Sequence, residues 1–152
     1  MCTSAFLRIR HLAVAHPAKY LDVALKASYL SFVKHASVNN EFSLRKISLL
    51  QKCVVELFCL ETASSYQHAF VYIRQLAIHL RGALRARTRT SSKKICNWQF
   101  LNCLRLWAAV LCHNASDALQ VDECPHGEEM WGLLVCVCVC VCACVHGCEP
   151  RP

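Results

Sequence analysis

The sequence predicts an all-α protein built from antiparallel helical hairpins, followed by a disordered or poorly structured C-terminal tail. Three observations support this prediction. Hydrophobic residues make up 55% of the 152 residues, more than an intrinsically disordered chain contains. Only four Gly and four Pro are present, too few for a turn-rich β-sandwich. Apolar residues recur at alternating spacings of three and four, which aligns them along one side of an α-helix.

The first two predicted helices flank a proline. Residues 6–15 form a short apolar and basic helix, and it ends at His16 because the residue before a proline is disfavoured in the α conformation. Pro17 suits the first turn of a second helix, which we expect to run to about Ala36. The predicted buried face of that helix consists of Leu21, Leu25, Ser28, Phe32 and Ala36.

A third helix is predicted over residues 43–60. Residues 37–40 are polar and turn-forming, and Asn40 or Ser43 is placed to cap the helix that follows. Its apolar face consists of Ile47, Leu50, Val54 and Leu57. Residues 61–65 then supply another break.

A helical hairpin follows, with helices from Ser65 to about Leu84 and from about Ile95 to His113. The first helix should bury Tyr66, Phe70, Ile73, Ala77, Leu80 and Leu84. The second should bury Phe100, Leu104, Trp107 and Leu111, with Trp98 and Leu101 on a neighbouring covered face. Residues 114–117 have the composition of a further turn and cap.

The two helix pairs begin near Pro17 and Ser64, about 47 positions apart. This spacing falls within the period of roughly 40–47 residues that is typical of HEAT-type helical repeats. Two units are equally compatible with a small irregular helical bundle, so the spacing leaves both arrangements open.

The loop of the hairpin is strongly basic. Arg81, Arg85, Arg87, Arg89, Lys93 and Lys94 occur without an intervening acidic residue. Cations at this density can neutralise several phosphates and release counterions, which makes these residues a candidate RNA-binding site. The alternative is a basic loop that is merely solvated, and no RNA-binding motif with stacking aromatic residues accompanies the run.

Catalytic motifs are missing from the sequence. It contains no glycine-rich phosphate loop, no Gly-x-Ser-x-Gly and no pair of carboxylates at a catalytic spacing. His79 and His113 lack acidic or cysteine neighbours at catalytic or metal-binding spacing. We therefore predict neither an enzyme nor a catalytic, metal or cofactor site.

The composition changes after Gln120. Up to that residue there are 16 Lys and Arg against five Asp and Glu, whereas one Arg faces five acids from Val121 onward. Residues 135–145 read VCVCVCVCACV, which an alternating G and T nucleotide repeat encodes. A CAG codon for Gln120 followed by the GT of a valine codon has the sequence of a splice donor. We therefore divide the chain into a helical fragment, 1–120, and a tail, 121–152, that we interpret as translated intron.

Two other interpretations of the tail are a metal site and a membrane span. Cys-x-Cys spacing is found in thiolate clusters that hold zinc or Cu(I), so a cysteine-rich metal-binding protein remains an alternative. Residues 131–145 are uncharged and apolar, but 15 residues fall short of the roughly 20 that cross a bilayer. We expect no membrane contact and favour a low-complexity, aggregation-prone segment.

The six cysteines between Cys2 and Cys112 fall on patterns that resemble buried helix faces. No cleavable signal sequence is evident, since charged residues interrupt the apolar stretch at the start. Without secretion these cysteines are expected to be reduced thiols that behave as small hydrophobic residues. The cysteine pattern and the lack of a signal sequence therefore predict a nuclear or cytosolic location for the protein.

Four segments carry a resemblance to a known family. They are FLRIRHLA at 6–13, YQHAFVYIRQLAIHLR at 66–81, NWQFLNCLRLW at 97–107 and SDALQ at 116–120. In this order and spacing they resemble the nucleolar complex protein 2 family over roughly residues 6–120. The resemblance stops at Gln120, where the composition changes.

The resemblance implies a HEAT-like α-solenoid fragment that acts as a non-enzymatic scaffold. Such proteins work in the nucleolus and nucleoplasm on maturation and transport of large-subunit ribosomal precursors. The implied partners are other nucleolar complex proteins and pre-ribosomal particles. Chromatin-associated transcriptional repression is an alternative function in the same family. No catalytic residue is carried over.

Overall fold

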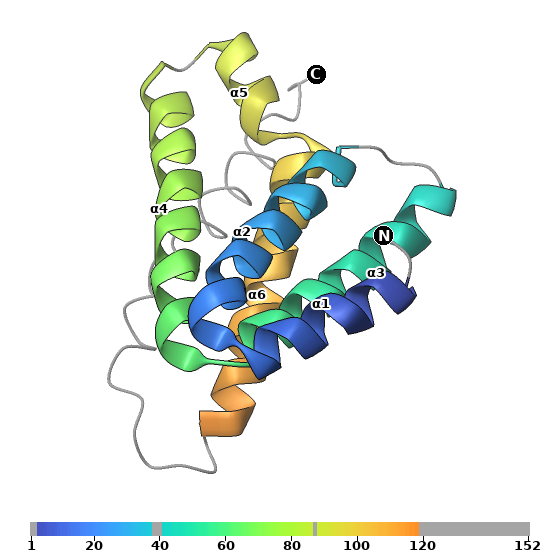
Figure 1. Cartoon of the computed structure of the whole chain (residues 1–152). Helices are drawn as coiled ribbons and strands as arrows, with labels where there is room; N and C mark the ends of the chain where they lie inside the picture. The colour runs from blue at the N-terminus through green and yellow to red at the C-terminus, as the bar shows by residue number, and fades with distance from the viewer. Residues whose placement is uncertain (1–2, 38–40, 87, 119–152) are drawn as a thin grey trace. The chain divides into compact units, whose positions relative to one another are not determined.

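The all-α prediction is confirmed by a computed structural model, which is helical with no strand in the parts that it describes (Figure 1). These parts are residues 3–37, 41–86 and 88–118, of which 41, 42, 89, 92 and 115–118 are described by their backbone alone. The chain forms two compact units, of which the first is Met1–His68 and the second begins at Ala69. The stacking of hairpins into a HEAT-like solenoid stays a prediction.

The first unit contains three helices that follow one another in contact. Helix α1 spans Thr3–Ala15, α2 spans Pro17–His35 and α3 spans Glu41–Phe58. Helix α2 packs on both α1 and α3, and α3 runs back in roughly the opposite direction to α2 (Figure 1). Pro17 occupies the first turn of α2, as its lack of an N–H predicts.

The buried faces predicted for α2 and α3 are confirmed. Leu21, Leu25, Ser28, Phe32 and Ala36 are all buried, and so are Ile47, Leu50, Val54 and Leu57. The one polar member of the α2 face, Ser28, donates its hydroxyl hydrogen to the carbonyl oxygen of Leu25 at 2.9 Å. This local hydrogen bond lets a hydroxyl lie in the core without an unsatisfied donor.

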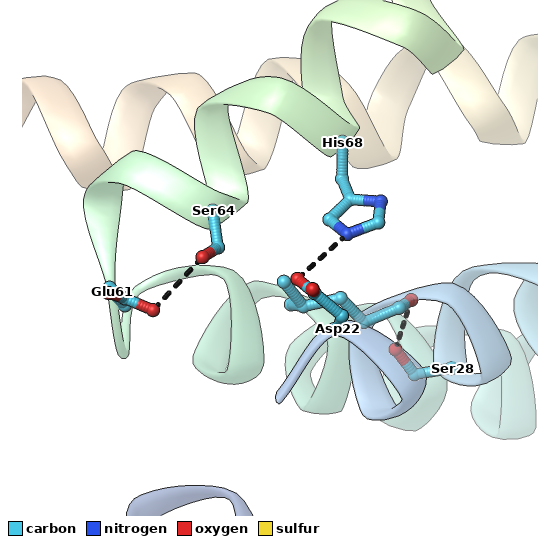
Figure 2. A network of polar contacts seen from close by, with 6 residues as sticks. Asp22, Ser28, Glu61, Ser64 and His68 are labelled. Carbon is cyan, nitrogen blue, oxygen red and sulfur yellow. Dashed lines mark hydrogen bonds and ion pairs between the residues drawn. The ribbon is translucent and has the colours of Figure 1, made fainter. Parts of the chain in front are cut away.

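A polar contact connects the start of α4 with α2 inside the first unit, and a second one lies at the start of α4 itself (Figure 2). Helix α4 spans Thr62–Ala86, and its His68 places Nε2 3.2 Å from Oδ1 of Asp22 on α2. Glu61 lies just before α4, and its carboxylate accepts a hydrogen bond from the hydroxyl of Ser64 in the first turn of α4, at 3.0 Å. The Asp22 side chain is 71% exposed, so this ion pair adds little to stability.

The buried face of α4 differs from the predicted one. Its buried residues are Ser65, Ala69, Ile73, Leu76, Leu80 and Ala83. Ile73 and Leu80 were predicted correctly, but Tyr66, Phe70 and Ala77 are half-buried and Leu84 is 40% exposed. The physical reason is that half of the buried stripe consists of small residues, Ser65, Ala69 and Ala83. A prediction based on the spacing of large apolar residues therefore places the buried face to one side of the stripe that is actually buried.

The basic segment is not the simple loop that we predicted, because residues Arg89–Ile95 form a short helix, α5. Thr88 precedes α5, and its Oγ1 accepts a hydrogen bond from the backbone N–H of Ser91 at 3.2 Å. This is the contact by which a threonine caps a helix start. The cap was overlooked because the surrounding arginines and lysines dominate the sequence pattern.

Helix α6 spans Trp98–Ala118 and confirms its predicted core face. Phe100, Leu104, Trp107 and Leu111 are buried. The predicted turn at 114–117 is wrong, because the helix continues through these residues. Asn, Ser and Asp are only modestly unfavourable in a helix, and neither Gly nor Pro is present to end it. The covered face predicted at Trp98 is also wrong, since this side chain is 49% exposed.

None of the five cysteines in the described part of the chain forms a disulfide, and only some of them are buried. Cys53 and Cys103 are buried and Cys59 is half-buried. Cys96 and Cys112 are exposed, which contradicts their assignment to core faces. The cysteine-rich tail and the apolar stretch at 131–145 lie outside the described residues, so the predicted boundary at 120 stays a prediction. Among the helices that are described, none has the length and apolar character to span a bilayer.

Candidate nucleic-acid interface

The first part of the second unit, Ala69 to Ser116, carries only positive charge. From Ala69 to Ser116 the sequence has eight Lys and Arg and no Asp or Glu, whereas the first 68 residues have eight Lys and Arg and four acids. A region without acids cannot neutralise its cations internally, so their field extends into solvent. The stretch from Ala69 to Ser116 is therefore the part of the chain best suited to attract a polyanion.

The structure divides the six predicted RNA-binding residues between two helices. Arg81 and Arg85 lie near the C-terminal end of α4, and Lys93 and Lys94 lie in the last turn of α5. All four side chains are exposed. Arg87 lies outside the described residues, and Arg89 begins α5 with only its backbone described.

None of these four described cations forms an ion pair with an acid of the described chain. Arg85, Lys93 and Lys94 each lie in the last turn of a helix, where a cation offsets the partial negative charge of the helix end. This gives them a structural role without consuming their hydrogen-bond donors. The ammonium and guanidinium groups remain available for phosphate oxygens.

Sequence reasoning missed the turn that joins α5 to α6. Asn97 donates from its Nδ2 to the carbonyl oxygen of Lys94 at 2.7 Å and accepts at its Oδ1 from the N–H of Phe100 at 2.8 Å. One side chain thus closes the end of α5 and caps the start of α6. The signal was present in the sequence, since an asparagine just before an apolar helical run is a strong N-cap.

Trp98 is the other residue whose position the sequence did not predict. It is the first residue of α6 and is 49% exposed, whereas Trp107 in the same helix is 0% exposed. Arg74 on α4 and Arg105 on α6 are exposed as well and belong to the same acid-free stretch, 69–116. An exposed aromatic ring and several cations therefore occur within one unit of the fold.

The described part of the chain contains no cluster of three or more His, Cys, Asp or Glu side chains that could bind a metal ion. His79 and His113 are both exposed. Burial and, secondarily, the charge of Glu56 raise the pKa of the Cys53 thiol. A raised pKa leaves less of the reactive thiolate at neutral pH, which is typical of a structural cysteine.

Comparison with known proteins identifies the family. A model of the Noc2p family matches residues 19–146, which is most of the chain. The chain belongs to the Noc2p family. It is 42% identical over 112 residues to "Nucleolar complex protein 2" of Drosophila melanogaster, covering 74% of this chain and 15% of that protein.

Two further relatives of this Noc2p-family chain come from distant organisms. "Nucleolar complex-associated protein 2" of Arabidopsis thaliana is 35% identical over 114 residues, covering 75% of this chain and 15% of the relative. "Nucleolar complex protein 2 homolog" of Caenorhabditis elegans is 30% identical over 122 residues, covering 78% of this chain and 17% of the relative. The chain thus spans about 15% of the length of the relatives that it matches.

These comparisons confirm the resemblance and, through the relatives' names, the nucleolar and nuclear localisation. The family match includes both α4 and α6, and so the whole candidate interface. It also extends to residue 146, which overlaps the segment 121–152 that we interpreted as translated intron. The origin of that segment stays a prediction, and sequencing the spliced transcript tests it.

Proposed function

We propose that this Noc2p-family chain is a non-enzymatic scaffold segment of a nucleolar ribosome-biogenesis factor, and that it acts in maturation and transport of large-subunit precursors. The family match over residues 19–146 is the observation that supports this most directly. The names of the relatives add the nucleolus as the location. The helices carry exposed apolar residues, and the HEAT-like arrangement that we propose for them would suit binding of other nucleolar complex proteins.

We further propose that the basic surface contacts pre-ribosomal RNA. This surface consists of the exposed side chains of Arg81, Arg85, Lys93 and Lys94, with Arg87 and Arg89 between them in sequence. Support comes from the absence of acids between Ala69 and Ser116 and from the lack of internal ion pairs at the four described cations. Each phosphate neutralised would release counterions, so binding should weaken steeply with salt.

Gradient sedimentation of nucleolar extract containing the tagged chain tests both proposals. The chain should travel with precursors of the large subunit and not with those of the small subunit. A variant with Arg81, Arg85, Lys93 and Lys94 changed to Gln should shift toward the top of the gradient and lose part of its salt dependence. Sedimentation of the unaltered chain away from all precursors would refute the scaffold proposal.

A matched control is available in the first unit. Changing Lys26, Lys34, Arg45 and Lys46 to Gln removes an equal number of positive charges from exposed positions. Lys34 lies in the last turn of a helix, as three of the cations in the tested variant do. This control variant should sediment like the unaltered chain. Equal loss in both variants would mean that net charge, rather than the surface on α4 and α5, determines association.

The two alternative functions predict different results in the same preparation. A chromatin-associated repressor would co-purify with histones in preference to ribosomal precursors. A metal-binding protein would carry zinc or copper that is lost when residues 121–152 are removed. No contact in the described part of the chain favours either alternative.

A further inference from the structure

We propose that the α5–α6 turn is a binding site for an unpaired nucleotide of RNA. In this site the Trp98 ring stacks on a base, and Lys93 and Lys94 contact the neighbouring phosphates. The inference rests on the RNA contact proposed above and specifies its class: single-stranded RNA rather than a duplex. Three structural features support it.

The first feature is the exposure of Trp98. Its side chain is 49% exposed, although tryptophan gains more from burial than most residues. No ring–ring or cation–ring contact to Trp98 occurs within the described residues, so the faces of the indole are not engaged by other aromatic rings or cations there. An indole held at the surface in this way offers a platform on which a base can stack.

The second feature is the rigidity of the turn. Ile95 at the end of α5 is 2% exposed and Phe100 in the first turn of α6 is 7% exposed, so buried side chains anchor both sides of Trp98. Between them, the Asn97 side chain is hydrogen-bonded to the Lys94 carbonyl oxygen and to the Phe100 N–H. The indole and the lysines are thus carried on one braced segment. A preorganised site of this kind loses less conformational entropy on binding.

The third feature is the charge around the turn. Lys93 and Lys94 are exposed, form no ion pair in the described chain and lie within five positions of Trp98. A base stacked on Trp98 has its phosphates a few ångströms away, within reach of long lysine side chains. The carboxylates of an acidic protein segment would satisfy the lysines, but Asp and Glu side chains offer no flat ring to stack on the indole.

Single-stranded RNA fits these features better than a duplex. The base faces of a duplex are stacked on one another and the deep major groove is closed to side chains, so an exposed tryptophan finds no surface to stack on. In an unpaired strand each base can turn out onto an aromatic ring while the backbone follows the cations. The combination of one ring and adjacent lysines is therefore selective for unpaired RNA.

Binding of fluorescently labelled oligouridylate and of an RNA duplex of equal length to the full chain tests the inference. The Trp98→Ala variant should bind oligouridylate about 5- to 150-fold more weakly, the range that loss of one stacked base produces. Its affinity for the duplex should be unchanged. The Trp98→Tyr variant should retain most of the affinity, whereas Trp98→Leu, which is apolar but cannot stack, should not.

The matched control is Ile78→Ala, which removes an exposed apolar side chain from α4 in the same unit. It should leave oligouridylate binding unchanged. Circular dichroism of each variant checks that the helices are retained, and Trp98→Tyr supplies the comparison if Trp98→Ala is poorly folded.

Failure of the inference is distinguishable from failure of the proposed RNA contact. Binding of oligouridylate that is equal for the unaltered chain and Trp98→Ala would overturn the stacking site and leave the basic RNA contact standing. No binding of either RNA by the unaltered chain would overturn both. Competition by polyglutamate as effective as competition by oligouridylate would assign the surface to an acidic protein partner instead.

Discussion

Tyr72 on α4 stacks against Trp107 on α6, with ring centroids 5.9 Å apart and ring planes inclined by 23°. Trp107 is 0% exposed, and desolvation raises the pKa of the Tyr72 phenol. Both residues belong to the second unit, so the pair links the helix that carries Arg81 and Arg85 to the helix that begins at Trp98. The geometry of the candidate interface therefore depends on this aromatic contact.

Trp107→Ala should destabilise the chain by about 3–5 kcal/mol, since it leaves a cavity at a fully buried site and removes the stack on Tyr72. The change is large enough to unfold a domain of marginal stability. Urea unfolding followed by circular dichroism measures it. The expected result is a much lower midpoint, or a chain that is already unfolded without urea.

Trp98→Ala is the matched control, because the same substitution is made in the same helix at a 49% exposed position. It should change the free energy of unfolding by less than about 1 kcal/mol. Comparable destabilisation by the two variants would mean that Trp98 is packed in solution. The proposed stacking site would then lose its main support.

Asn97→Ala should lower the stability by about 1 kcal/mol, because it removes the cap of α6 and the bond to the Lys94 carbonyl oxygen. Asn97→Asp separates the two contributions. A carboxylate still accepts from the Phe100 N–H but cannot donate to Lys94. Thermal unfolding should therefore place Asn97→Asp between the unaltered chain and Asn97→Ala, and equal midpoints for both variants would contradict a capping role.

Much of the first unit could be predicted from the sequence. In α2 and α3 large apolar residues alternate with lysine and arginine at helical spacing, so pattern and packing agree. Pro17 and the polar turn after α2 mark the boundaries in a way that depends only on local chemistry. This is why every position predicted to be buried on α2 and α3 is buried, although Ala24, Tyr29 and Val55 are buried as well.

The second unit was harder to predict, for reasons that are specific to its residues. Small residues, Ser65, Ala69 and Ala83, make up half of the buried stripe of α4, and periodicity in large apolar residues does not reveal that. Trp98 has a hydrophobic side chain that the fold leaves half exposed, which depends on tertiary packing rather than on spacing. The candidate interface was recognised by its charge, whereas its aromatic component became evident only from the structure.

The exposed side of α1 should bind a hydrophobic dye. Leu7 is 57% exposed and Leu12 is 47% exposed, and together with Arg8 and His11 they line a shallow, largely apolar surface. We expect the chain to raise the fluorescence of anilinonaphthalene sulfonate, and the double variant Leu7→Gln, Leu12→Gln to reduce that signal. Contiguous apolar surface binds such dyes more strongly than scattered side chains do.

A second double variant serves as control for the dye experiment. Val23→Gln with Leu30→Gln removes two exposed apolar side chains from α2 that do not line the surface on α1. It should reduce the fluorescence less than the α1 variant. An equal reduction would indicate dye binding without preference for the surface on α1.

The stability of the chain should fall as the pH rises above 9, because Cys53 is buried. Burial, followed by the charge of Glu56, raises the pKa of the Cys53 thiol above its ordinary value of 9.0. The unfolded state then releases this proton at a lower pH than the folded state. Alkaline pH therefore favours the unfolded state, in which the thiolate forms more readily. The stability of the folded chain is lost between the pKa of the thiol in the unfolded state and its higher pKa in the folded state. Tyr72 should add a second loss above pH 10, where burial has the same effect on its phenol.

Urea midpoints measured in reducing buffer at pH 7.5, 9 and 10 test this pH dependence. Cys53→Ala should be less stable at pH 7.5 and should show a smaller decline between pH 7.5 and pH 10, because the buried thiol is gone. Val55→Ala removes a buried apolar side chain from the same helix and ionises nothing, so it should lower the midpoint without reducing that decline. A decline of the same size in Cys53→Ala and Val55→Ala would show that Cys53 remains accessible to water in the folded chain.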